Sequence, residues 1–143
     1  MNKVFSPETI LRALLEECLA SFAEDGETPT ERAVDDWIDC CISDAEFVSS
    51  DEFENVHQLV FEKDGKHWSC RFERNDGAEY NDLVPYRSWR THVFLLQEDG
   101  SWVLNDEIAK ELSERSFTCV EVHKVTKTIE VWEPVKETDD ATA

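Results

Sequence analysis

A chain of 143 residues is long enough for one domain with its own core, and 41% hydrophobic residues, including five Trp and eight Phe, exclude a disordered chain. The net charge is −19, from 33 acidic against 14 basic residues. A negative charge of this size disfavours direct binding to nucleic acid or to an anionic membrane.

Cysteine usage and the N-terminal residues both bear on the compartment. The five cysteines are odd in number and include the adjacent Cys40 and Cys41, which favours reduced core thiols over a disulfide framework. The N-terminus leads directly into an amphipathic pattern, and no apolar run approaches the length of a membrane span. We therefore expect a cytoplasmic protein without a signal peptide.

A first helix is predicted after Ser6, which is a good N-cap, with Pro7 at the first helical position. Gly26 indicates its end. Between them, apolar residues recur at helical spacing and form one stripe. These residues are Leu11, Leu14, Leu15, Cys18, Leu19 and Phe22.

A second helix is predicted from the sequence Thr28-Pro29-Thr30-Glu31, in which Thr28 and Glu31 form a capping box. Its apolar face would contain Val34, Trp37, Ile38, Cys41, Ile42 and Ala45. The opposite, polar face would contain Asp35, Asp36, Asp39 and Cys40. Residues 43–55 are acidic and irregular, and we expect a loop or a short extra helix there.

Two hairpins follow. Asp64-Gly65 is a strong signal for a two-residue turn, and it pairs Phe61 with Trp68, Leu59 with Cys70, and His57 with Phe72. The second hairpin joins strands at 93–96 and 102–104. Its register is ambiguous, although a longer loop that pairs Leu96 with Trp102 gives the better packing.

The remaining elements complete an α+β pattern. Residues 74–90 read as a long loop, Asn105 can cap a short helix that buries Ile108 and Leu112, and strands are predicted at 117–123 and 128–135. We expect one domain over residues 1–135 and a frayed acidic tail over 136–143. Its two N-terminal helices and one short later helix would pack on one face of a mostly antiparallel sheet of about five to six strands.

Motifs for chemistry are absent, and we predict no catalytic residue, metal site or cofactor. The four glycines do not cluster into a phosphate-binding loop. His67 and Cys70 would point to opposite faces of a strand, and Cys119 and His123 would lie about 13 Å apart along one. Cys40 is the thiol expected to be exposed, and the surrounding acids would raise its pKa.

Bases and aromatic residues mix only in the segment 71–90. Tyr86, Arg87, Trp89 and Arg90 could therefore form a secondary binding site. The alternative, which we favour, is that this segment pins itself to the acidic surface through ion pairs and cation–π contacts.

The charge is concentrated in the N-terminal part of the chain. Residues 1–62 contain 16 acids and 3 bases, a net charge of −13, whereas residues 63–93 sum to +1 and residues 94–143 to −7. Solubility or adaptation to high salt would also explain acidity, but self-repulsion of this size opposes compaction beyond what solubility requires. Carboxylates held on rigid helices can instead imitate the phosphates of a nucleic acid.

We therefore expect a non-enzymatic acidic interaction protein that occludes the basic surface of a nucleic-acid-handling protein. An inhibitor encoded by a phage against CRISPR or restriction systems, working in the host-cell cytoplasm, would be one example. The alternatives are an immunity protein against a cationic bacterial toxin, an acidic secretion chaperone, or a small α+β enzyme with a pocket between helices and sheet. The expected partner-binding residues are Glu31, Asp35, Asp36, Asp39, Asp44, Glu46, Asp51, Glu52 and Glu54.

Overall fold

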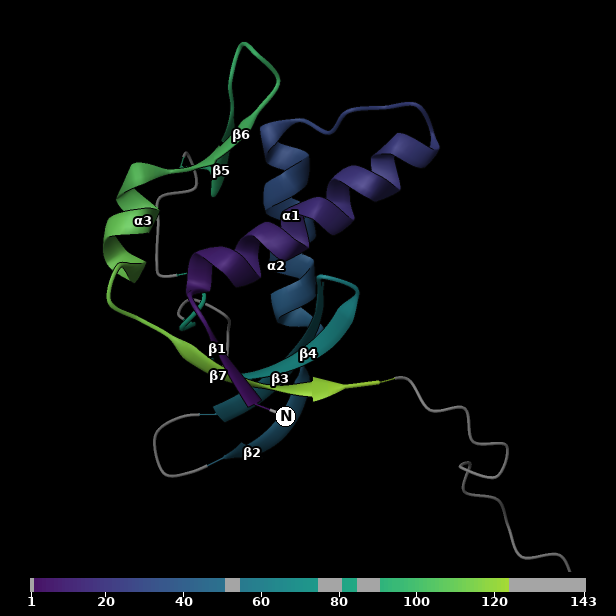
Figure 1. Cartoon of the computed structure of the whole chain (residues 1–143). Helices are drawn as coiled ribbons and strands as arrows, with labels where there is room; N and C mark the ends of the chain where they lie inside the picture. The colour runs from purple at the N-terminus through teal and green to yellow at the C-terminus, as the bar shows by residue number, and fades with distance from the viewer. Residues whose placement is uncertain (1, 51–54, 75–80, 85–90, 124–143) are drawn as a thin grey trace, which may run out of the picture.

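The computed structural model of the chain (Figure 1) describes residues 2–50, 55–74, 81–84 and 91–123. A five-stranded antiparallel sheet has the order β1-β7-β4-β3-β2. Its strands are β1 (Asn2–Phe5), β2 (Glu46–Ser50), β3 (Asn55–Lys63), β4 (Lys66–Arg74) and β7 (Phe117–Val122). The helices are α1 (Pro7–Glu24), α2 (Glu31–Ser43) and α3 (Asp106–Leu112), and a separate two-stranded sheet contains β5 (Phe94–Leu96) and β6 (Trp102–Leu104). The predicted α+β class is confirmed.

The β3–β4 hairpin is the centre of the main sheet, and its turn determines its register. Asp64 and Gly65 both have positive φ, 54° and 77°, as a type I′ turn requires. The predicted cross-strand pairs are confirmed, because Phe61 lies opposite Trp68, and the pairing continues along both strands. Every second residue of this hairpin therefore faces the helices.

The two long helices begin at capped residues, as the sequence indicated, but the second cap differs from the expected one. Ser6 Oγ accepts a hydrogen bond from the backbone N–H of Thr9, with Pro7 at the first helical position. At α2, Thr30 Oγ1 accepts from Ala33 N at 3.1 Å. The predicted capping box of Thr28 with Glu31 is thus wrong, because the helix starts at Glu31 and the capping side chain must directly precede it.

Two edge strands were not predicted. Residues 46–50 form β2 where a loop or short helix was expected, and residues 2–5 form β1 ahead of the first helix. A register shift between Phe47 and Ser49 interrupts the alternation of β2. Such a bulge removes the period of two on which recognition of a strand in a sequence depends.

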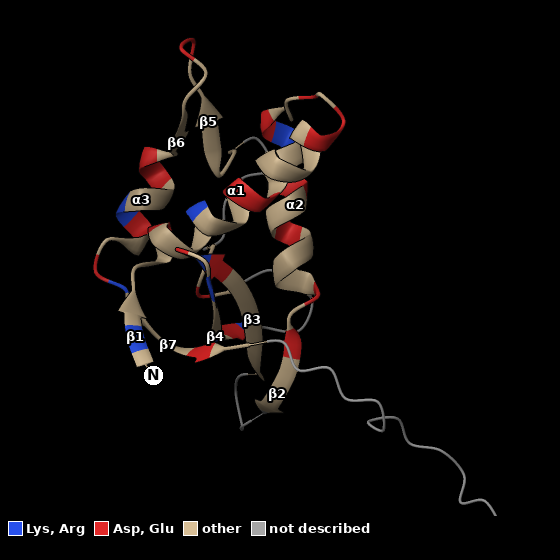
Figure 2. Cartoon of the chain, turned by 45° about the vertical axis from the view of Figure 1, so that its right-hand side comes forward, with Lys and Arg blue, Asp and Glu red and all other residues tan. Residues whose placement is uncertain are grey.

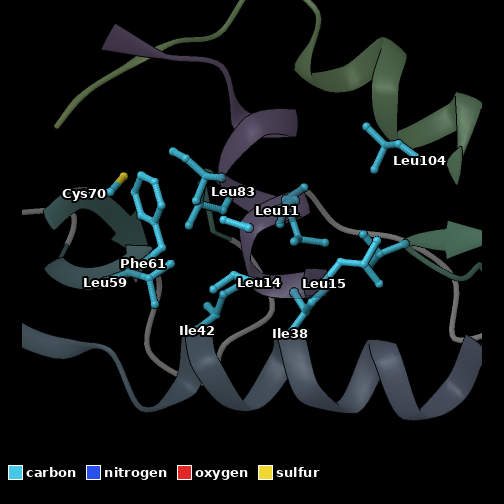
Figure 3. Packing of buried hydrophobic residues seen from close by; sticks show 14 of the residues in the cluster. Leu11, Leu14, Leu15, Ile38, Ile42, Leu59, Phe61, Cys70, Leu83 and Leu104 are labelled. Atoms are coloured by element: carbon cyan, nitrogen blue, oxygen red, sulfur yellow. The ribbon is translucent and has the colours of Figure 1, made fainter. Parts of the chain in front are cut away.

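The hydrophobic core lies between α1, α2 and the inner face of the main sheet (Figure 3). The predicted stripe of α1 is confirmed, with Leu11 and Leu14 fully buried. Figure 3 shows Leu14 and Leu15 of α1 directed toward Ile42 and Ile38 of α2, and Phe61 of β3 belongs to the same buried cluster. Removing one such side chain from water stabilises the fold by roughly 1.5–3 kcal/mol. The core thus fixes both helices against the sheet.

The smaller sheet and α3 agree with the sequence-based expectation. Leu96 pairs with Trp102, which confirms the register with the longer loop. Asn105 Oδ1 accepts from Glu107 N at the start of α3, and Ile108 and Leu112 of this helix are buried. The predicted strand 128–135, the tail 136–143 and most of the loop 74–90 lie outside the described residues.

No helix in the described ranges has the length and apolar composition needed to cross a membrane.

Candidate functional site

Exposed carboxylates follow α2 from its second turn to the strand after it. We call Asp36, Asp39, Asp44 and Glu46 the acidic ridge, and all four side chains are exposed, as predicted. Asp36 and Asp44 are separated by about 12 Å along a helix axis. Arg32 approaches Asp36 at 3.9 Å, but both side chains are 68% exposed, so this ion pair contributes little. The ridge therefore presents a line of anionic groups to solvent (Figure 2).

The C-terminal ends of α1 and α2 carry acidic residues, although the C-terminus of a helix already has a partial negative charge. Neither α1 nor α2 has a basic residue in its last turn. Instead, Asp44 caps α2, and Asp25 caps α1. Figure 2 shows acids around the connection between the two helices as well. Acidic residues at these positions interact unfavourably with the helix dipole. Their presence is therefore not explained by a gain in helix stability.

Asp35 was expected on the exposed face of α2, and this expectation is wrong. Its residue is only 5% exposed. Oδ1 accepts a hydrogen bond from the backbone N–H of Val93 at 2.8 Å, and Oδ2 lies 2.6 Å from Nδ1 of His92. The segment that leads into β5 covers this side of α2, and helical periodicity within α2 cannot reveal a cover from a distant part of the chain.

Glu31 is also engaged within the fold. Its Oε2 accepts from the backbone N–H of Leu96 at 2.8 Å, and its Oε1 lies 4.0 Å from Nε2 of His92. His92 therefore lies between two carboxylates of α2. Glu31 binds β5 and Asp35 binds the two residues before it, so among the described residues of the predicted site it is the ridge residues that face solvent.

Arg74, at the end of β4, offsets the acidic C-terminus of α2. Its guanidinium donates to the carbonyl oxygens of Ile42 and Ser43, the latter at 3.0 Å, and it also lies 2.9 Å from Nε2 of His57. Both carbonyls belong to the last turn of α2, where intrahelical donors run out, and the Ile42 carbonyl also accepts from Ala45 N at 3.3 Å. Arg74 belongs to the segment that mixes bases and aromatic residues, and it serves the fold by pinning a strand to a helix.

A groove borders the acidic face of α1. It has a volume of about 620 Å³ and lies between α1 and the tip of the β3–β4 hairpin. Its charged lining residues are Glu8, Arg12, Glu16, Glu17, Glu62, Lys63 and Asp64. Arg12 lies 3.5 Å from Glu8, and Lys63 lies 3.8 Å from Asp64, so Glu16, Glu17 and Glu62 give the groove its excess of negative charge.

Glu17 shows the electrostatic consequence of this crowding. Burial raises the pKa of Glu17, the Glu62 carboxylate raises it further, and His67 lowers it. The charged form is therefore disfavoured at this position, and a cation that entered the groove would relieve the repulsion. Sequence reasoning missed this groove. Glu8, Arg12 and Glu16 do recur at helical spacing, but the sequence does not show that the hairpin tip lies against them.

The burial of the five cysteines varies along the chain, and the thiol predicted to be exposed, that of Cys40, is exposed. Cys18, Cys70 and Cys119 are buried, Cys41 is half-buried, and Cys40 is exposed. Burial raises the pKa of Cys41 to about 11, with nearby acids adding to the effect. Within the described ranges, no three His, Cys, Asp or Glu side chains gather as a metal site would require.

Asp51, Glu52 and Glu54 lie outside the described residues, as do Tyr86, Arg87, Trp89 and Arg90 of the predicted secondary site.

No family model, curated protein or solved structure matches this chain. Its function is therefore inferred from the geometry and charge of the described residues.

Proposed function

We propose that this protein is a non-enzymatic acidic interaction protein, which binds a basic surface of a nucleic-acid-handling protein and blocks access to it. The acidic ridge would make the principal contact. The groove beside α1 would receive a protruding Lys or Arg side chain of the partner.

The observation that supports this proposal is the excess of acids on the helical layer, by which we mean α1, α2 and the residues that join and directly follow them. Residues 7–46 contain 12 acids and only two bases, Arg12 and Arg32. Both bases already lie within 4 Å of an acid, Arg12 near Glu8 and Arg32 near Asp36. Glu31 and Asp35 bind the segment around β5, and most of the remaining carboxylates lie on α1 and α2 or directly at the ends of these helices, which the core fixes in place. A rigid anionic surface loses little conformational freedom on binding a cationic cleft.

The placement of the acids at the helix ends gives independent support. Asp25 and Asp44 oppose the dipoles of their own helices. Self-repulsion among the groove carboxylates opposes folding in the same way. A basic partner would convert both unfavourable features into favourable contacts, and long-range attraction would speed its approach.

Affinity capture with the full-length protein as bait tests the proposal. Two bait variants carry the same change in net charge. The ridge variant, Asp36→Asn/Asp39→Asn/Asp44→Asn, neutralises three of the four ridge residues. The α3 variant, Glu107→Gln/Glu111→Gln/Glu114→Gln, neutralises exposed acids on and just after α3. Glu31 and Asp35 are left unchanged because they hold β5.

We expect the wild type and the α3 variant to retain a basic protein from a bacterial lysate at low salt, and the ridge variant to lose it. The purified partner should release bound DNA or RNA when the wild-type protein is added. A toxin nuclease as the retained partner would favour the immunity-protein alternative. Capture of a neutral or acidic partner, equally by all three baits, would refute the proposal.

A further inference from the structure

Two buried thiols face each other across the centre of the main sheet. Cys70 of β4 and Cys119 of β7 are register partners, and each is 0% exposed. Residues that lie directly opposite in an antiparallel pair point to the same face, with Cα atoms about 4.5 or 5.5 Å apart. Both separations fall within the range of about 4.4–6.8 Å over which a disulfide can form.

The two thiols also interact directly. Cys70 Sγ lies 3.8 Å from the Arg71 carbonyl oxygen, and Cys119 Sγ lies 3.7 Å from that of Phe117. The neighbouring Cys119 sulfur and burial raise the pKa of Cys70, whereas the Cys70 thiol lowers the pKa of Cys119, although burial partly opposes this second effect. Two neighbouring thiols supply both groups that thiol–disulfide exchange needs, one to attack and one to resolve.

From this juxtaposition we infer that Cys70 and Cys119 are a reversible oxidation site, at which a disulfide links β4 to β7 when a small disulfide oxidant such as oxidised glutathione is present. The Cys119 thiolate attacks the glutathione disulfide, forms a mixed disulfide and releases one glutathione thiolate. Cys70 then loses its proton, attacks the Cys119 sulfur and releases the second glutathione. The protein loses two electrons and two protons, and the oxidant becomes two reduced glutathione molecules.

Burial of the two sulfurs limits the rate at which an oxidant reaches them. Both sulfurs lie beneath the helical layer, so an oxidant reaches them only when the sheet or helix opens locally. Oxidation of the native protein should therefore be slow, and refolding from urea in the same buffer should give the same product rapidly.

Peptide mapping of the full chain provides the test. The protein is refolded from urea in a glutathione redox buffer, free thiols are alkylated, and trypsin is added without reduction. Cleavage at Lys and Arg places Cys70 in the peptide 67–71 and Cys119 in the peptide 116–124, each with a single cysteine. Of the other three cysteines, Cys18 lies in the peptide 13–32, and Cys40 and Cys41 share the peptide 33–63.

We expect the linked pair 67–71 with 116–124 to be the dominant disulfide, and the oxidised protein to melt roughly 10 °C higher than the reduced protein, because the link closes a long loop. Cys70→Ser should abolish the linked peptide and leave Cys119 as a glutathione adduct. Cys40→Ser should behave like the wild type, with the same linked peptide and the same rise in melting temperature. Recovery of Cys70 and Cys119 as alkylated thiols from the refolded wild type, or preferential linkage to other cysteines, would overturn the inference.

Discussion

Asp35 and Asp36 are neighbours in the sequence, yet their carboxylates have opposite roles. Asp35 is buried and holds the backbone of Val93 and the ring of His92, whereas Asp36 is 68% exposed in its side chain. A rotation of about 100° per residue separates their directions around the helix. The formal charge is the same, but its surroundings make one acid part of the fold and leave the other available to a partner.

We predict that alanine substitutions at these two neighbouring positions differ greatly in their effect on the free energy of unfolding. Asp35→Ala should lower the free energy of unfolding by about 2–4 kcal/mol, because it leaves a buried N–H and an imidazole without their acceptor. Asp36→Ala should change it by no more than about 0.5 kcal/mol, because it removes only an exposed ion pair. Urea denaturation followed by Trp fluorescence measures both, and equal effects would show that Asp35 does not hold β5.

The raised pKa of Glu17 predicts a pH-dependent effect on stability. Because the pKa of Glu17 is higher in the folded chain than in the unfolded chain, the folded chain binds the proton more tightly. Protonation of Glu17 therefore favours folding at low pH. This contribution is lost as the pH rises from the ordinary glutamate pKa through the raised pKa of the folded state. Glu17→Gln should therefore be more stable than the wild type at pH 7. The difference should disappear below about pH 4, where glutamate is protonated in both states.

A second substitution identifies the source of this effect. In a Glu62→Gln background, the gain from Glu17→Gln should shrink, because the Glu62 carboxylate is one of the two causes that raise the pKa of Glu17. Thermal unfolding curves at a series of pH values supply the comparison. A Glu17→Gln protein that is less stable than the wild type at pH 7 would contradict the account of the groove.

At the scale of elements, the start of α2 gives a direct test of local structure. Thr30 provides the capping oxygen, whereas Thr28 is exposed and lies two residues earlier. Thr30→Ala should therefore cost about 1 kcal/mol of folding stability, and Thr28→Ala close to none. Chemical denaturation of both variants tests this assignment, and the reverse order would restore the capping box that the sequence suggested.

Elements with strong local signals could be predicted from the sequence. The Asp64-Gly65 turn defined the register of β3 and β4, and Ser6 and Asn105 marked the starts of α1 and α3. The edge strands β1 and β2 could not be predicted in this way. The first has four residues, and the second is bulged, so their pairing depends on neighbours that are distant in the sequence.

The candidate site was predictable to the extent that it depends on helical periodicity. Asp36 and Asp39 lie on the solvent side of α2, as the spacing of its apolar residues indicated. The burial of Asp35 and the groove beside α1 depend instead on contacts with the segment before β5 and with the β3–β4 turn. Tertiary contacts of this kind leave no periodic signal in a single sequence.

On the scale of the whole molecule, the dominant feature is the uneven distribution of charge. The helical layer combines a ridge, acidic helix ends and an acidic groove, while basic side chains such as Arg74 and Arg115 donate to backbone carbonyls within the fold. This pattern costs stability through self-repulsion. We attribute it to the binding of a basic partner, for which the helical layer is the rigid anionic surface.

The most direct test of that claim is the salt dependence of the affinity for the captured partner, measured for the wild type, the ridge variant and the α3 variant. The account predicts that the ridge variant binds about tenfold or more weakly at low salt, with a shallower loss of affinity as salt rises, and that the α3 variant stays within about twofold of the wild type. Affinities that are independent of salt, or that fall equally in the two variants, would contradict it.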